Sequence, residues 1–156
     1  MRRLLPALAL LLAASAADAQ VRQGLVELGG AGFLTLREDP LLVLQPTVGY
    51  FVSDRVEVGL NPSIATDFDD ASALVTAFGA LHFPSSPGAR TVPFVGAEVG
   101  ADLNGDGDVV LGAQAGVKQF FLPGGALTVA VAANASGGLD NVAARVQAGV
   151  SIFIGR

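Results

Sequence analysis

The C-terminal part of the chain alternates between aliphatic residues and residues of other kinds. From position 142 to position 154 every even position is aliphatic, whereas the odd positions hold Ala, Arg, Gln, Gly, Ser and Phe. A period of two predicts a β-strand with two chemically different faces. The second face is small and only weakly polar, which is unusual for a surface that meets water.

The same alternation recurs along most of the chain between connections rich in Gly, Pro, Asn, Asp and Ser, as hairpin turns require. Eight strands are predicted, over residues 24–36, 41–52, 56–66, 72–83, 92–102, 109–121, 126–135 and 142–154. These segments exceed the ~5–6 residues of an ordinary strand and reach the ~9–11 residues that a tilted strand needs to cross hydrocarbon. The strand at 72–83 has no clear polar face, so the direction of His82 is left open.

Charged residues inside the assigned strands all share the small-residue face. They are Glu27, Glu57, Glu98, Lys118 and Arg145. Water-facing surfaces carry about a quarter to a third charged residues, whereas a lipid-facing surface excludes them. The pattern therefore predicts an all-β fold, an eight-stranded antiparallel up-and-down transmembrane β-barrel with these charges inside.

An interior charge network has two interpretations. Buried charges must pair or hydrogen-bond, so we expect the five side chains to form an ion-pair plug that fixes the packing. A proton or ion relay is the alternative. Eight strands leave no aqueous channel, so we expect no open pore.

Two features run against a membrane barrel. Pro46 and Pro62 fall within predicted strands, where proline removes a ladder donor. The aromatic girdle is also thin, because the chain has no Trp and one Tyr, with nine Phe.

The N-terminus predicts a signal peptide over residues 1–19. Arg2 and Arg3 precede an apolar run, and Ala17-Asp18-Ala19 forms an A-x-A cleavage site. A retained N-terminal anchor is the alternative. Residues 20–156 then form one domain. The net charge of −5 argues against nucleic acid as a partner, and the absence of cysteine excludes disulfides and thiolate metal sites.

Residues 48–60, with Gly49-Tyr50-Phe51 followed by Ser53-Asp54, resemble the second hairpin of the small outer-membrane β-barrel family, of the OmpA/OmpX-like, porin-family type. The resemblance implies residence in the cell outer membrane, contact with outer-membrane lipid and insertion by the barrel-assembly machinery. It implies no activity, since this fold carries many functions. Family members usually end on an aromatic residue, whereas here residues 154–156 follow Phe153.

One connection resembles the first half of a calcium loop. Its oxygen-bearing residues alternate around a glycine turn, at Asp102, Asn104, Asp106 and Asp108. The twelfth position, usually a bidentate Glu, is Ala113. A weak calcium site and an ordinary polar hairpin loop are both open; we expect no other cofactor.

The connections at 37–40, 67–71, 102–108 and 136–141 fall at one end of the predicted barrel. Their charged residues are Arg37, Glu38, Asp39, Asp67, Asp69, Asp70, Asp102, Asp106, Asp108 and Asp140. Such a rim repels anionic lipid headgroups unless divalent cations bridge them; a plain solvated face is the alternative.

Catalysis has little support. His82 lies near Ser85 and Ser86, and lipid A deacylase barrels use a His–Ser pair, but the surrounding motif is lacking. We therefore expect no enzyme, but a barrel with a structural or membrane-integrity role. The alternatives are a secreted soluble lipocalin-like barrel that binds a hydrophobic ligand and, with less support, a lipid-modifying enzyme.

Overall fold

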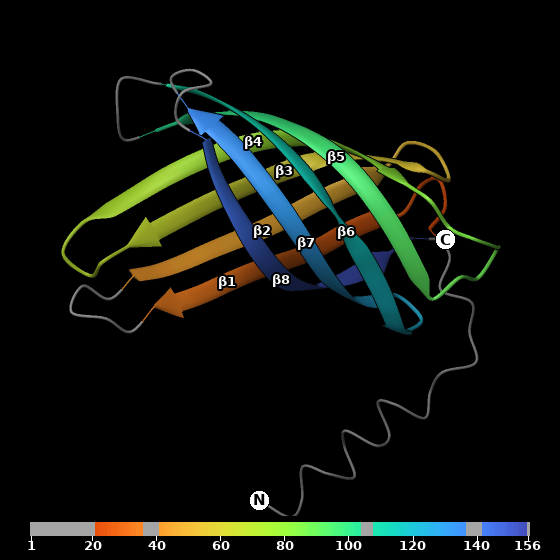
Figure 1. Cartoon of the computed structure of the whole chain (residues 1–156). Coiled ribbons are helices and arrows are strands. Elements are labelled where there is room, and N and C mark those ends of the chain that lie inside the picture. Colours follow the sequence, from red (N-terminus) through yellow and green to blue (C-terminus); the bar gives the residue numbers. More distant parts are fainter. Residues whose placement is uncertain (1–20, 36–40, 104–107, 137–141, 156) are drawn as a thin grey trace, which may run out of the picture.

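The computed structural model describes residues 21–35, 41–103, 108–136 and 142–155, and of residues 33–35 the backbone alone. Within this part, eight strands form one closed antiparallel barrel in which each strand pairs with its sequence neighbours and β8 pairs with β1 (Figure 1). The strands are β1 (Val26–Thr35), β2 (Leu41–Phe51), β3 (Val56–Thr66), β4 (Ala71–His82), β5 (Thr91–Asp102), β6 (Val109–Leu122), β7 (Gly125–Ser136) and β8 (Val142–Ile154). The predicted fold is confirmed. No described helix has the length and apolar character to span a membrane.

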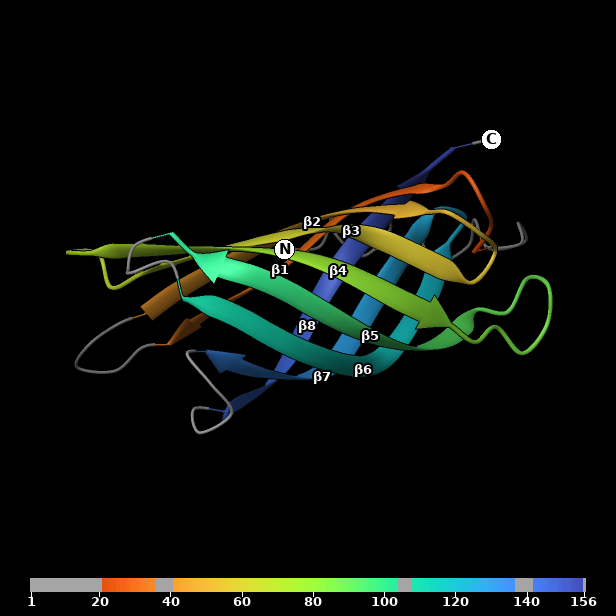
Figure 2. The ribbon, with the colours of Figure 1, turned by 90° about the horizontal axis from the view of Figure 1, so that it is seen from above.

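The aliphatic stripes point away from the barrel interior. Val146, Val150 and Ile152 on β8 are 75%, 59% and 55% exposed, whereas Glu57 is 1% exposed. Figure 2 shows the strands running obliquely across a single-layered wall. The outer face is thus mainly aliphatic on every side, and Glu27, Glu57, Glu98 and Lys118 lie within.

Strand β4, which lacked a polar face in the sequence, turns His82 inward. Its buried positions alternate from Thr76 through Phe78 and Ala80 to His82, which is fully buried. Most inward positions are themselves apolar, so the two faces of this strand differ too little for the alternation to reveal its direction.

The two ends of the barrel differ in what they carry. We call the turn end the one with residues 52–55, 83–90 and 123–124, where residues 21–25 and 155 also lie (Figure 1). The opposite end, the loop end, holds residues 67–70, 103 and 108. The connections at 36–40, 104–107 and 137–141, with Arg37, Glu38, Asp39 and Asp140, lie outside the described residues.

An apolar plug fills the barrel at the turn end. Its members are Val21, Leu25, Phe51, Val92, Phe120 and Ala126, with Ala89 and Phe153 packed against them. The segment before β1 is tied across this end, because Gly24 N–H donates to Phe51 O and Phe51 N–H donates to Leu25 O, both at 2.9 Å. Apolar side chains therefore occupy the lumen here.

Several phenylalanines that sequence analysis counted toward an aromatic girdle lie inside instead. Phe51, Phe94 and Phe120 are buried in the lumen. Tyr50 and Phe121, by contrast, are 47% and 40% exposed on the outer face. The outer face therefore carries fewer aromatic side chains than the sequence count suggests, because several phenylalanines pack inside the barrel.

The closing seam between β1 and β8 is paired along part of its length. The pairs run from Val26↔Ile154 to Ala31↔Gly149. Beyond them, toward the loop end, β8 continues its pairing with β7 as far as Ala135↔Val142. The seam is therefore closed over the turn-end half of the barrel.

The pairing between β2 and β3 has a gap at mid-strand. It stops after Leu44↔Ile64 and resumes in the same register at Val48. The unchanged register places Pro46 and Pro62 opposite each other inside the gap. The two prolines that ran against a strand assignment are thus within strands, and they interrupt the ladder between them.

The gap follows from the missing proline N–H groups. Asn61 O accepts a hydrogen bond from Thr76 Oγ1 on β4 at 3.0 Å. Successive residues direct their peptide groups to alternate neighbours, so those of Pro62 face Pro46 on β2. Neither residue has an N–H to donate, and both ladder bonds of this pair are lost.

Inward side chains bridge the same stretch. Thr47 Oγ1 donates to Asn61 Oδ1 at 2.6 Å, and Gln45 Nε2 donates to Ser63 Oγ at 3.3 Å. Side-chain hydrogen bonds on both sides of the proline pair thus hold the wall together from within.

We expect Pro46→Val to stabilise the folded barrel relative to a matched control, Pro123→Val in the β6–β7 turn. The new N–H faces the Pro62 carbonyl, and one such bond contributes about 0.5–1.5 kcal/mol. Both substitutions remove one proline and therefore raise the conformational entropy of the unfolded chain by the same amount. The difference between the two urea midpoints therefore measures the contribution of the new hydrogen bond. Folded protein is measured by heat-modifiable gel mobility; equal midpoints would contradict the prediction.

Candidate functional site

Five buried polar side chains meet directly above the apolar plug. We call them the Lys118 cluster: Glu27, Glu57, His82, Lys118 and Ser151, each at most 7% exposed. Lys118 Nζ on β6 donates to Glu27 Oε2 on β1 and, at 3.0 Å, to Glu57 Oε2 on β3. Ser151 Oγ on β8 donates to Glu27 Oε1 at 2.6 Å. The cluster therefore ties strands from around the barrel to one ammonium group.

His82 belongs to this cluster, although sequence analysis did not place it. Its Nε2 lies 2.9 Å from Glu57 Oε2. In the described part of the chain, His82 Nδ1 has no hydrogen-bond partner. The ring lies between Phe51 and Phe94, with centroids 5.0 and 5.5 Å away.

Aromatic faces surround the Lys118 ammonium below its carboxylate partners. Its Nζ lies 5.9 Å from the Phe51 centroid, 5.8 Å from that of Phe94 and 5.5 Å from that of Phe153. Ring faces attract cations within about 6 Å. The plug thus contributes to holding the charge that caps it.

A second polar group lies farther toward the loop end. We call it the Glu98 cluster: Asn134 Nδ2 donates to Glu98 Oε1 at 2.7 Å, and Arg145 Nη1 donates to Asn134 Oδ1 at 3.0 Å. Arg145 Nη2 lies 3.6 Å from Glu98 Oε1, and its Nε donates to Gln147 Oε1 at 3.2 Å. The Arg145 side chain is 32% exposed, whereas that of Glu98 is 2% exposed.

The five predicted interior charges thus form two groups. Glu27, Glu57 and Lys118 contact one another, and Glu98 contacts Arg145. Among the described residues, no hydrogen bond or ion pair recorded for these charges joins one group to the other. The alternation along each strand predicts that these side chains point inward. Which of them contact one another depends on the stagger between neighbouring strands.

A small cavity lies beside the Lys118 cluster. It is lined by Glu57, Lys118, Gln114, Gln147 and Thr47, among others, and offers about 60 Å³ to the centres of water molecules. One water molecule occupies roughly 10–15 Å³. The space therefore suits a few waters, and the plug closes it from the turn end.

Two of the three interior carboxylates lie over glycine residues of neighbouring strands. Glu57 Oε1 lies over Gly49 on β2, where a Cβ would collide with it, and a Cβ on Gly112 would come within 2.6 Å of Glu98 Oε1. The small-residue face of the barrel thus makes room for the charges of neighbouring strands.

The predicted calcium loop lies largely outside the described residues, since Asn104 and Asp106 are among those not described. Its two ends are joined, because Asp102 N–H donates to Asp108 O at 3.1 Å. Elsewhere in the described part, no group of three or more His, Asp or Glu side chains is arranged to hold a metal ion.

The His–Ser pair considered in the sequence is not formed. His82 is sealed in the lumen and bonded to Glu57, whereas Ser85 and Ser86 line a surface cavity at the turn end. A hydrolytic arrangement would need the serine hydroxyl within hydrogen-bond reach of the imidazole.

The loop-end turn between β3 and β4 is organised by one carboxylate. Asp67 Oδ1 accepts N–H groups from Asp70 at 2.7 Å and from Asp69 at 3.1 Å. These backbone hydrogen bonds favour the ionised form and lower the pKa of Asp67 below its ordinary value.

We expect Gly49→Ala to destabilise the barrel by roughly 1–3 kcal/mol, because the new methyl group must displace the Glu57 carboxylate from its place. Gly79→Ala is the matched control, since a Cβ there meets nothing within 4 Å. Urea midpoints of refolded protein measure both. A Gly49→Ala midpoint equal to that of the control would show that the Glu57 position is not fixed.

We expect an NMR titration of Asp67 to give a midpoint below the ordinary ~3.9 of an Asp carboxyl. Because the folded-state pKa is depressed, this turn's stabilisation is complete above the unfolded value and is lost as the pH falls through the folded value. A midpoint at or above the ordinary value would contradict the two backbone hydrogen bonds.

Comparison with known proteins agrees with the architecture. No protein-family model matches the sequence, and no curated protein matches it significantly. Among solved structures, the N-terminal β-barrel domain of Pseudomonas aeruginosa OprF matches with a TM-score of 0.66 and 22% identity, over 85% of this chain and 98% of that one.

Two further structures match over most of their length. A de novo designed transmembrane β-barrel has a TM-score of 0.65 and 17% identity, over 86% of this chain and 99% of that one. Neisserial surface protein A has a TM-score of 0.58 and 15% identity, over 82% of this chain and 94% of that one. The chain therefore has the fold of the eight-stranded transmembrane β-barrels.

Proposed function

We propose that this chain is an outer-membrane protein, a closed barrel with a structural or membrane-integrity role, no open pore and no catalytic activity. The observation that carries the proposal is the exposed aliphatic outer face, with Val146 75% exposed while Glu27 and Glu57 are sealed inside. Such a surface suits hydrocarbon. The structural likeness to OprF and NspA supports the same environment.

The interior supports a closed barrel. The apolar plug fills the turn end, and the Lys118 cluster lies across the lumen above it. A solute would have to displace Phe51 and Phe120 and separate Lys118 from two carboxylates. Removing one partner of such a buried ion pair costs about 3–5 kcal/mol, so the interior serves as a packed core.

Export and insertion complete the proposal. Residues 1–19 act as a signal peptide that is removed, and the barrel-assembly machinery inserts residues 20–156. Sequence analysis supports the first step through the A-x-A site, and the resemblance supports the second. Residues 1–20 lie outside the described part of the chain.

Divalent cations at the loop end belong to the same proposal. Asp67, Asp69, Asp70, Asp102 and Asp108 all lie at this end in the described part. Divalent cations would bridge these carboxylates to anionic lipid headgroups. Weak calcium binding at Asp102, Asn104, Asp106 and Asp108 is the more specific form of this proposal.

The soluble lipocalin-like alternative fits the structure less well. A carrier of hydrophobic ligands needs an open apolar lumen and a polar outer face, whereas this barrel has an aliphatic outer face and a lumen packed with the apolar plug and with charged clusters. The cavity of about 60 Å³ is lined by charged and amide side chains as well as apolar ones, and it is far below the ~300–1,000 Å³ of a ligand pocket.

Cell fractionation tests the proposal. We expect the mature protein in the outer-membrane fraction, extractable with detergent, and with different gel mobility before and after heating because a closed barrel resists unfolding. Recovery in the aqueous periplasmic fraction would overturn it. Planar-bilayer recordings of the same material should show no steady conductance, and a stable open channel would overturn the closed-barrel part alone.

A further inference from the structure

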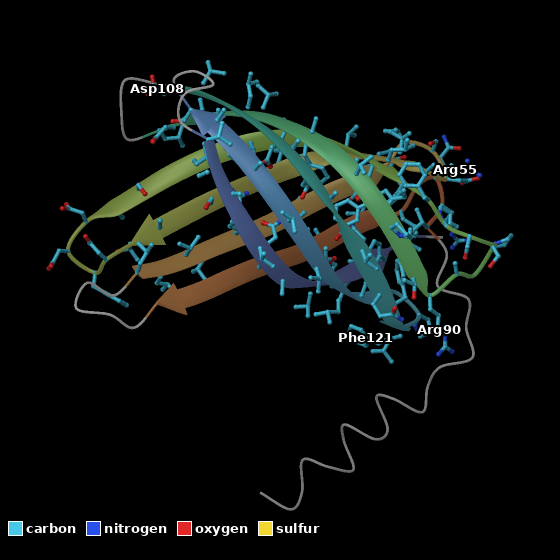
Figure 3. The ribbon with its side chains drawn as sticks, in the orientation of Figure 1. Arg55, Arg90, Asp108 and Phe121 are labelled. Carbon is cyan, nitrogen blue, oxygen red and sulfur yellow. The ribbon has the colours of Figure 1, made fainter. Side chains whose placement is uncertain are left out.

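The charged residues outside the lumen differ in sign between the two ends of the barrel. At the turn end, Arg22, Arg55 and Arg90 accompany Asp54, whereas the charged residues described at the loop end are all acidic. Figure 3 shows Arg55 and Arg90 at one end of the barrel and Asp108 at the other. The turn end is therefore the basic end of the described molecule.

Three segments of the turn end enclose a pocket that two of these arginines line. Residues 21–22, residues 54–55 and the connection 84–89 surround it, and it offers about 400 Å³ to the centres of water molecules. Its polar lining consists of Arg22, Asp54, Arg55, Ser85 and Ser86. The space is large enough for a phosphodiester headgroup, and the two guanidinium and two hydroxyl groups in its lining can donate hydrogen bonds to one.

The two guanidinium groups have no recorded carboxylate partner among the described residues. The nearby Asp54 Oδ1 accepts the backbone N–H of Gln23 at 2.9 Å, and no ion pair includes Arg22 or Arg55. The backbone beneath them is nevertheless fixed, since His82 N–H donates to Arg55 O at 2.7 Å. Two cations on a fixed backbone thus line one pocket together with the Asp54 carboxylate, which forms no ion pair with either of them in the described part.

The pocket lies where the apolar outer face ends. Val52 and Phe83, which immediately precede the pocket-forming segments, are 40% and 46% exposed, and Leu81 on the adjoining strand is 40% exposed. In a bilayer, the headgroup phosphates lie just beyond the hydrocarbon boundary. An arginine fork binds phosphate oxygens in pairs.

We propose that this turn-end pocket binds the phosphate of an anionic phospholipid through Arg22 and Arg55, with the Ser85 and Ser86 hydroxyls as further donors. The occupant is a lipid rather than free phosphate, because the apolar belt beside the pocket continues toward the acyl chains. This inference rests on the membrane location proposed above.

Native mass spectrometry tests the site. Mature barrel is folded into nanodiscs that contain phosphatidylglycerol and phosphatidylcholine in equal amounts, and the ratio of the two lipids retained after release is measured. We expect phosphatidylglycerol to be enriched roughly fivefold per arginine. This factor corresponds to the ~1 kcal/mol that one cation contributes near an anionic surface. Arg22→Gln with Arg55→Gln should return the ratio to that of the bulk.

Arg90→Gln is the matched control, because it removes a cation from the same end but not from the pocket. It should keep the enrichment. Arg22→Lys with Arg55→Lys should keep part of it, because lysine retains the charge but not the guanidinium fork. Equal loss in Arg90→Gln and in the double glutamine variant, or enrichment unchanged by the latter, would overturn the site. If the double variant does not fold, the two single variants are compared instead.

A second experiment distinguishes a bound lipid from bound free phosphate. Inorganic phosphate added at constant ionic strength should leave the phosphatidylglycerol ratio unchanged; displacement of the lipid at equal concentration would overturn the lipid as occupant. A failed membrane location is separable, because the barrel would then stay outside the nanodiscs and show no heat-modifiable mobility. A folded, inserted barrel without lipid preference would overturn this inference alone.

Discussion

Closure of the sheet between β1 and β8 is the constraint on which the rest of the molecule depends. A single-layered sheet that spans hydrocarbon must have no free edge, and here the closing pairs from Val26↔Ile154 to Ala31↔Gly149 lie over the turn-end half. The interior reinforces that half, since the hydrogen bond from Ser151 Oγ to Glu27 Oε1 spans the seam. Lys118 then connects Glu27 to Glu57 across the lumen.

The interior is organised in layers because each kind of side chain needs a different neighbour. Apolar rings at the turn end exclude water and provide faces for the Lys118 ammonium. The carboxylates above it need space, which glycines such as Gly49 leave on the adjacent strands. Toward the loop end, Arg145 is partly exposed, so its pairing with Glu98 is less completely removed from water. Burial and charge thus change together along the barrel axis.

The strands, and the direction of most of their side chains, could be predicted from the sequence. A period of two is visible wherever one face of a strand is aliphatic and the other is not. The same parity also placed Phe51 with Thr47 and Gly49, so the inward direction of this ring was available but was interpreted as part of a girdle. For His82, aliphatic residues on both faces of β4 removed the contrast. The separation of the Lys118 and Glu98 clusters depends on strand stagger, which no single strand encodes.

The gap at Pro46 and Pro62 has a consequence for how the wall comes apart. The hairpin of β1 and β2 is joined to β3 by an interrupted ladder on one side and to β8 by a seam of limited length on the other. Between themselves, β1 and β2 pair continuously from Val26↔Tyr50 to Thr35↔Leu41. This hairpin is therefore a unit bounded by two weak joints, and under mechanical load it should peel away whole before any other pair of strands separates.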